Sequence, residues 1–207
     1  TSFTTLHQSY ISYGRTPLGP DFLATDEMTI PPVFFRDEID SISKEEDYFD
    51  ETHNHPNIST RRAAVAGKLK DTTAGKKFFV QPEEKFYELR TLARFEAVRE
   101  KVLYSRYGDV LYDLYVLEKE FPDNKFLEMS KVRALFGLAS FKAVDKISEV
   151  TESPYQVEGP SQQAYHIIKQ LNSEQMVSVA LHHVLKAKEK YPEEKILDEY
   201  TYYLNRY

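Results

Sequence analysis

The 207-residue chain contains no cysteine, no tryptophan and only seven glycines. The absence of cysteine excludes disulfides, thiolate zinc sites and cysteine nucleophiles, and it fits a reducing or an oxidising compartment equally well. Basic residues number 27 against 33 acidic ones, which gives a net charge of −6 and argues against a general nucleic-acid binder. No apolar run approaches the ~18 residues of a membrane-spanning helix. Because 41% of the residues are hydrophobic, we expect a globular, acidic protein rather than a disordered one.

The prolines divide the chain into two parts. Five of the ten lie in the first 56 residues, among turn-like stretches such as residues 14–20. Since an X-Pro step disfavours helix for the preceding residue, we expect residues 1–56 to be mostly irregular, with one short helix over residues 36–42. So long an irregular segment is unusual in a compact domain. We therefore expect it to wrap the helical part, to line a site or to belong to a larger body.

From residue 58 onwards the apolar residues follow a helical pattern. A Ser or Thr at position 59 or 60 can cap a helix over residues 61–69. After Pro82, apolar residues recur at helical steps to the end of the chain. They predict helices over residues 86–102, 110–121, 125–150, 162–171, 173–190 and 193–207. The predicted fold class is therefore all-α, with an irregular, loop-rich N-terminal arm.

Two stretches of the helical part repeat each other 70 residues apart. Residues 117–127 match residues 187–197 in character, and both contain an aromatic residue followed by proline. Seventy residues is about two periods of a 34-residue helix-turn-helix unit. The spacing resembles a degenerate tetratricopeptide-type array, in which paired helices stack into a layer. The Trp-containing start of that motif is absent and residues 152–161 break the period, so an irregular helical bundle is the alternative.

The densest cluster of potential metal ligands lies in residues 45–56, which carry carboxylates together with His53 and His55. Carboxylates and imidazoles can hold zinc or another divalent ion. One short segment supplies few ligands, so an acidic loop is the first interpretation and a loop metal site the second. A further pair, His182 and His183, falls in a predicted helix, where neighbours point about 100° apart. We expect one of them to be partly buried and the other exposed.

Residues 52–65 carry the motif that is most informative about function. His55-Pro56 is followed by Arg61, six residues after the histidine. The segment resembles the one that closes the catalytic domain of M48-family (CAAX-prenyl-endopeptidase-like) zinc metallopeptidases, where a His-Pro turn precedes an Arg that opens a helix. Proline fixes such a turn, and arginine can clamp a carboxylate or backbone carbonyls. Asn54 departs from the Ser or Thr that usually precedes the histidine.

The helical part extends this resemblance. Residues 112–122 and 134–141 are similar to the tetratricopeptide-like region that several bacterial members carry after the peptidase domain. The resemblance implies that residues 1–80 form an irregular arm and the end of a peptidase-like domain, and that residues 81–207 form a tetratricopeptide-like helical domain. It also implies an extracytoplasmic, periplasmic or envelope-associated location.

The zinc-binding helix of these peptidases is missing from the chain. The family needs His-Glu-x-x-His, whose imidazoles bind zinc and whose Glu activates water, and the sequence has no such motif. We expect the catalytic part either to lie upstream of Thr1 or to be absent from a remnant that only binds. These residues alone are then expected to bind no zinc and to hydrolyse nothing. In a full-length, zinc-containing enzyme, His55, Pro56 and Arg61 would lie near the cleft.

Three functional hypotheses follow. The first is the non-catalytic C-terminal portion of an M48-like zinc metallopeptidase, whose helical repeats bind a substrate or partner protein. The second is a free-standing helical-repeat adaptor for protein–protein interaction. The third is a metal site at His53 and His55 with its own catalysis. None of the three involves nucleic acid or a membrane span in this segment.

Overall fold

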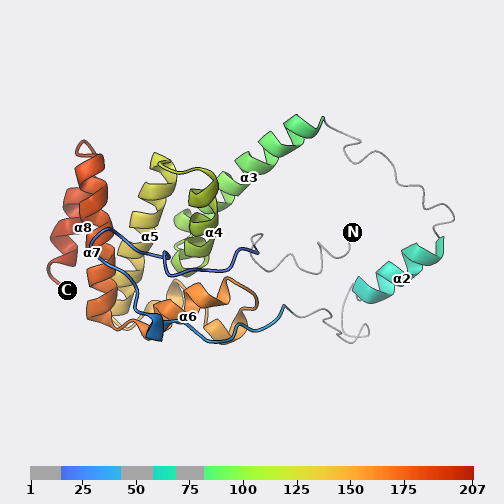
Figure 1. Ribbon diagram of the computed structural model, residues 1–207, viewed down its shortest axis with the longest axis horizontal. Helices are drawn as coiled ribbons and strands as arrows, with labels where there is room; N and C mark the ends of the chain where they lie inside the picture. The colour runs from blue at the N-terminus through green and yellow to red at the C-terminus, as the bar shows by residue number, and fades with distance from the viewer. Residues whose placement is uncertain (1–14, 43–57, 69–81) are drawn as a thin grey trace. The chain divides into compact units, whose positions relative to one another are not determined.

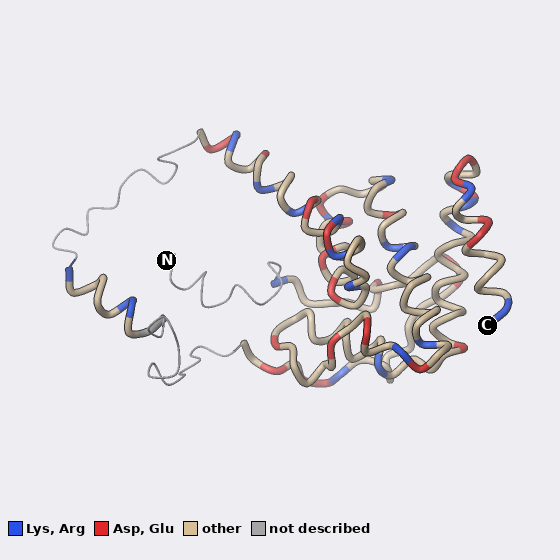
Figure 2. The backbone as a smooth tube through the Cα atoms, turned by 180° about the vertical axis from the view of Figure 1, so that it is seen from behind, with Lys and Arg blue, Asp and Glu red and all other residues tan. Residues whose placement is uncertain are grey.

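The computed structural model describes residues 15–42, 58–68 and 82–207. Within these ranges it contains helices and connecting segments but no strand, so the all-α prediction is confirmed for the described part of the chain (Figure 1). None of the helices in these ranges is long and apolar enough to cross a membrane. Figure 2 shows acidic and basic residues interspersed along the helices.

The chain divides into two compact units. The larger contains the described residues of Ser12–Ser41 together with Phe95–Tyr207, and the smaller contains helix α2 and the beginning of α3. The elements are η1 (Pro32–Phe34), α2 (Ile58–Lys68), α3 (Glu83–Leu103), α4 (Tyr107–Glu120), α5 (Lys125–Ala143), η3 (Ile147–Glu149), η4 (Pro154–Gln156), α6 (Gln162–Gln170), α7 (Ser173–Lys190) and α8 (Ile196–Leu204). A domain boundary at residues 80–81 stays a prediction.

Two helical hairpins form the layer of the larger unit. Helices α4 and α5 make one hairpin, α7 and α8 make the other, and α5 packs on α7 between them (Figure 1). Helix α6 packs against α4. Helix α4 is central, because every residue from Gly108 to Leu117 is buried. A helix buried on all sides needs cover beyond its hairpin partner, and residues 15–41 supply part of it.

Two predictions about the elements are wrong. The helix predicted over residues 125–150 ends at Ala143, because Asp145 adopts a left-handed φ of 57°. The N–H of Lys146 then donates to the Phe141 carbonyl, which satisfies a terminal carbonyl of α5. The short helix predicted over residues 36–42 does not form, and the 3-10 helix η1 lies just before it. The backbone of Asp40 is instead bonded to residues near the start of α6.

Candidate functional site

Residues 15–41, which we call the strap, lie on the helical layer. The strap passes α4, α5 and α7 and returns beside α6 (Figure 1). Three of its side chains enter the core: Phe22, Leu23 and Ile30 are exposed by 1%, 5% and 4%. The strap contains only the single 3-10 turn η1. An irregular segment is therefore held on the helices by its own side chains and by contacts to its backbone.

Helix α4 binds the first part of the strap through two tyrosines. The Tyr112 hydroxyl donates to the Thr16 carbonyl at 2.8 Å. The Tyr115 hydroxyl accepts from the Gly19 N–H at 3.0 Å and donates to Asp21 at 2.9 Å. Buried tyrosines need partners for their hydroxyl groups, and here the strap provides them. Burial raises the pKa of Tyr112 to about 12, so this contact stays protonated at neutral pH.

An aromatic contact and an ion pair complete the attachment to α4. The rings of Phe22 and Tyr115 meet edge to face, with centroids 5.8 Å apart. Lys119 Nζ lies 3.3 Å from Asp21 Oδ2. Burial alone would raise the pKa of Asp21, but hydrogen bonds with Tyr115 and Lys119 lower it overall. The α4 side of the face therefore recognises a carboxylate followed directly by an aromatic ring.

Helix α7 binds the middle of the strap through a buried histidine. His183 Nε2 lies 3.1 Å from the Leu23 carbonyl oxygen, and since a carbonyl only accepts, this nitrogen carries the proton. Burial, reinforced by the nearby charge of Lys131, lowers the pKa of His183 to about 3 and keeps the ring neutral. Leu23 has a φ of 57°, a strained value for this residue type. The strain turns its carbonyl toward α7 while its side chain is buried.

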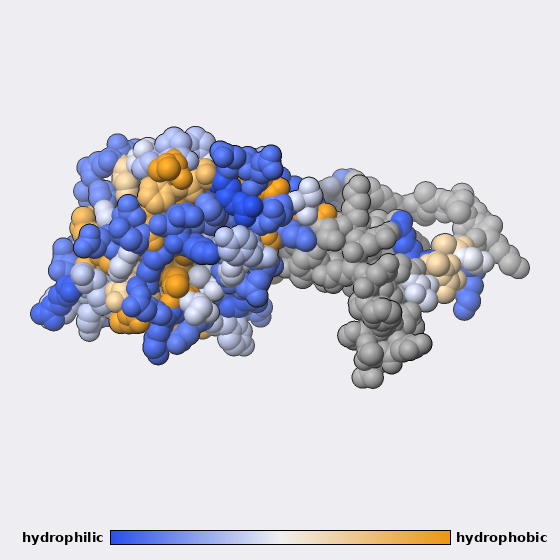
Figure 3. All heavy atoms as spheres, turned by 90° about the horizontal axis from the view of Figure 1, so that it is seen from below, coloured by the Kyte–Doolittle hydropathy of each residue, from blue (hydrophilic) through white to orange (hydrophobic). Residues whose placement is uncertain are grey.

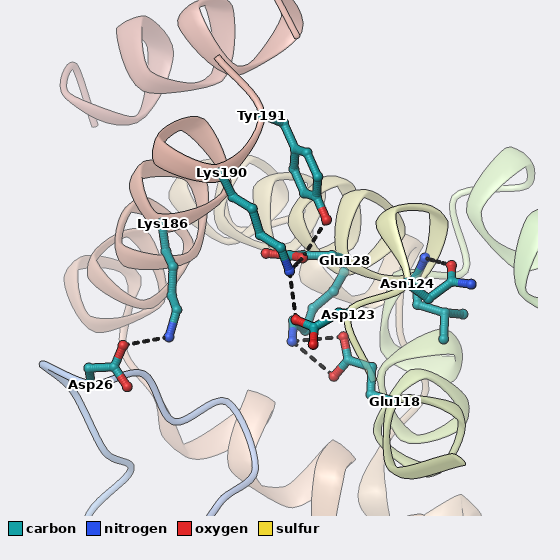
Figure 4. Close-up of polar contacts among 10 residues, drawn as sticks. Asp26, Glu118, Asp123, Asn124, Glu128, Lys186, Lys190 and Tyr191 are labelled. Atoms are coloured by element: carbon teal, nitrogen blue, oxygen red, sulfur yellow. Dashed lines mark hydrogen bonds and ion pairs between the residues drawn. The ribbon is translucent and has the colours of Figure 1, made fainter. Parts of the chain in front are cut away.

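Helix α7, like α4, pairs a lysine with a carboxylate of the strap. Lys186 Nζ lies 2.8 Å from Asp26 Oδ2, which Figure 4 shows reaching from the strap toward α7. The hydrogen bond from Lys186 is the main cause that lowers the pKa of the exposed Asp26. A lysine thus faces a strap carboxylate on each of the two helices.

The returning limb of the strap is held at the start of α6. The buried Gln162 side chain accepts from the Asp40 N–H at 2.8 Å. The Gly159 N–H donates to the Asp40 carbonyl at 2.9 Å. Gln162 also donates to the Pro154 carbonyl at 2.9 Å. These bonds fix the strap at its second end.

The two hairpin turns lie side by side and are joined by ion pairs (Figure 4). Lys190 at the end of α7 lies 2.9 Å from both Asp123 and Glu128. Tyr191 donates a hydroxyl hydrogen bond to Glu128 at 3.0 Å. The hydrogen bond with Glu128 is the main cause that raises the pKa of Lys190. These contacts join the end of α7 to the α4–α5 turn and to the first turn of α5.

Hollows are also found among the described residues of the larger unit. One of about 260 Å³ lies between α3, α5 and α8 and is mostly apolar, with Arg99 and Arg133 among its lining residues. The second, of about 250 Å³, lies between α5 and α6 and includes Lys142. Lys142 donates to the carbonyl of Ile168 near the C-terminus of α6, and burial lowers its pKa. That lysine therefore acts as a helix cap. In Figure 3 apolar patches interrupt the hydrophilic surface of this unit.

The structure describes only some of the site residues that were predicted from the sequence. His53, His55 and Pro56 lie outside the described residues, while Arg61 is exposed in the first turns of α2. In the described ranges no three His, Asp or Glu side chains come together as a possible metal site. His183 is buried and its neighbour His182 is partly exposed.

Sequence reasoning missed the tyrosines and lysines that hold the strap. The available signal was the spacing of Tyr112 and Tyr115 on the apolar face of α4, since each hydroxyl buried there requires a partner. A comparison of the chain with protein-family models, with curated proteins and with solved structures found no match.

Proposed function

We propose that residues 95–207 form a non-catalytic module that binds an extended protein segment on the face made by α4 and α7. The strap is the observation that supports the proposal. It is an irregular segment with three apolar side chains buried, its backbone hydrogen-bonded to Tyr112, Tyr115 and His183, and two of its carboxylates paired with lysines. Paired-helix layers bind extended segments in this way.

The proposal includes a degenerate tetratricopeptide-like layer. Its support is the similarity of the α4–α5 and α7–α8 turns, which lie at the positions of the 70-residue sequence repeat. Phe121 and Tyr191 have nearly the same backbone angles, and each N–H donates at 2.8 Å to the carbonyl four residues earlier. Helix α6 and residues 152–161 interrupt the regular alternation of paired helices.

The proposed setting is the C-terminal portion of an extracytoplasmic M48-like zinc metallopeptidase. Its support is α2, which starts at Ile58 and carries Arg61 near its beginning, as the resemblance to a His-Pro turn before an Arg-bearing helix requires. The zinc site would then belong to polypeptide upstream of Thr1. A reading frame encoding His-Glu-x-x-His upstream would support this setting. An intact gene that begins near Thr1 would instead favour the hypothesis of a free-standing adaptor.

Selection of random displayed peptides on the full chain tests the binding proposal. Because the strap covers the face, the bait should carry Phe22→Ala, with its helicity and thermal melt measured first. Selected peptides should bind at least about tenfold more weakly when Lys119 and Lys186 are both changed to Glu, because opposite charges have become like charges. Lys146→Glu together with Lys195→Glu, which makes the same total charge change at two exposed lysines that do not contact the strap, is the control. Selection of no binding peptide, or equal loss in the control, would overturn the proposal.

A further inference from the structure

We infer that the strap occupies the α4–α7 face in the place of a partner segment, and that the partner carries an Asp-Phe-Leu-x-x-Asp core like that of residues 21–26. The inference rests on the proposed function and adds to it the chemistry of the ligand and the way access is controlled. The partner is a separate protein that presents this core in extended form. The strap must leave the face before the partner can bind.

The contacts divide the recognition into three parts. Asp21 accepts a hydrogen bond from Tyr115 and pairs with Lys119. Phe22 packs against the Tyr115 ring. Asp26 pairs with Lys186. These contacts depend on the side chains of the bound segment and give it a sequence preference. The acidic–aromatic–aliphatic order therefore defines the ligand class.

The remaining contacts are made to the backbone of the strap rather than to its side chains. Tyr112 bonds the Thr16 carbonyl, Tyr115 the Gly19 N–H, and His183 the Leu23 carbonyl. All three are side chains of the helices that bond the backbone of the strap. The helices therefore contact the strap in the way that a receptor groove contacts a bound peptide, through hydrogen bonds to its backbone. A different chain with the same core can satisfy the same donors and acceptors.

The strap is suited to exchange because it has few anchors for its length. Three of its apolar side chains are fully buried, whereas most of its other described residues are exposed or half-exposed. Ordering so many residues opposes docking, and the left-handed Leu23 adds strain. Its attachment to the same chain compensates for this, because a tethered segment binds again in an intramolecular step.

Cutting the chain between strap and helices tests the inference directly. A specific protease site is inserted between residues 43 and 57 of the full chain, and the folded protein is cut. A fluorescent peptide of residues 15–30 is then added, and anisotropy reports binding while circular dichroism reports helicity. We expect the peptide to replace the strap with helicity retained, and to bind the uncut chain at least about tenfold more weakly because the tether competes.

Variant peptides identify the recognised core. Phe22→Ala in the peptide should weaken binding by at least about 100-fold, because truncation of a buried ring is costly, while Asp26→Ala at the exposed ion pair should weaken it by less than about fivefold. Equal effects of the two changes would overturn the assigned core. Lack of exchange, or exchange only with loss of helicity, would show that the strap is a permanent part of the fold.

The outcomes separate this inference from the proposed function. If peptides selected from the library bind the face but neither resemble residues 21–26 nor compete with the strap peptide, the binding module stands and the inference is wrong. A dimer that forms by exchange of straps between two copies, detected by light scattering after mild warming, would replace the separate partner with a second chain. If no selected peptide binds, the proposed function itself is wrong.

Discussion

The α4–α5 and α7–α8 turns share a backbone conformation but differ at the start of the second helix. Phe121 has φ −129° and ψ 69°, and Tyr191 has φ −131° and ψ 63°. Beyond the following proline the turns diverge. The Asn124 side chain caps α5 by accepting from the Leu127 N–H at 3.2 Å, whereas Lys195 gives α8 no side-chain cap.

The difference shows that buried apolar residues determine the backbone conformation of the turn, and that the side-chain cap is not required for it. Leu127 and Leu197 are both fully buried, each a few residues after its turn. On the incoming helices, Leu117 and Ala187 occupy equivalent buried positions. The shared conformation therefore follows the apolar positions, which the two hairpins have in common. The cap is present in only one of them, so it cannot be the cause of the conformation.

The largest expected effect comes from emptying the two equivalent apolar positions. Leu127→Ala and Leu197→Ala should each lower the free energy of unfolding by about 2–5 kcal/mol, through lost burial and the cavity left behind. Leu127 should cost more, because α5 lies between α4 and α7 while α8 packs mainly on α7 and can relax. Urea unfolding measures both. Leu185→Ala, at a side chain 43% exposed, is the control and should cost under about 1 kcal/mol. Equal losses at the two leucines would contradict the distinction between a central and an outer hairpin.

Between about pH 7 and pH 5, acid should act on the strap through the second hairpin. His183 has its pKa lowered from 6.5 to about 3, so below about pH 6.5 the unfolded chain takes up a proton that the folded chain refuses. The free energy of unfolding should therefore fall with decreasing pH, by up to about 1.4 kcal/mol per unit from this group, until the folded pKa is reached.

His183→Gln isolates this effect, because glutamine keeps a donor for the Leu23 carbonyl but does not titrate. Urea unfolding between about pH 7 and pH 5 should show a shallower pH dependence in the variant than in the unchanged chain. The carboxylates are common to both proteins and cancel in the comparison. The same slope in both proteins would mean that His183 is not buried in its neutral form.

The smallest expected effect concerns the cap itself. Asn124→Ala should lower the free energy of unfolding by about 1 kcal/mol, the usual cost of losing a capping side chain. Lys195→Ala, at the residue that immediately precedes α8, should change it by less than about 0.5 kcal/mol. Thermal unfolding of both variants measures the pair. If the two substitutions cost the same, the asymmetry between the turns has no energetic consequence.

The helices were predictable because the apolar spacing that defines them is local. Helix α7 was predicted with its observed bounds, and its capping box at Asn172 and Gln175 shows why its start was clear. The end of α5 was not predictable from spacing. Val144, Ile147 and Val150 continue the helical rhythm, and a single left-handed residue, Asp145, interrupts it.

The candidate site was less accessible to sequence reasoning. That residues 1–56 would wrap the helices was one of three expectations, and the described strap does so. Its partners could not be identified, because Tyr112 and Thr16 are 96 residues apart and His183 and Leu23 are 160 apart. Such pairings depend on the fold of everything between them. The compact motif of the resemblance to M48 peptidases lies in residues 52–65, of which residues 52–57 lie outside the described ranges, and the resemblance stays a prediction.

The separation between Leu23 and His183 has a consequence for biosynthesis. A ribosome adds Leu23 160 residues before it adds the histidine that bonds it. At a usual elongation rate of about 5–20 residues per second, the surface of α7 that binds Leu23 is synthesised on the order of ten seconds after the strap. During that interval Phe22 and Leu23 are available to chaperones, and any ready-made cognate groove in a neighbouring molecule could capture the nascent strap first.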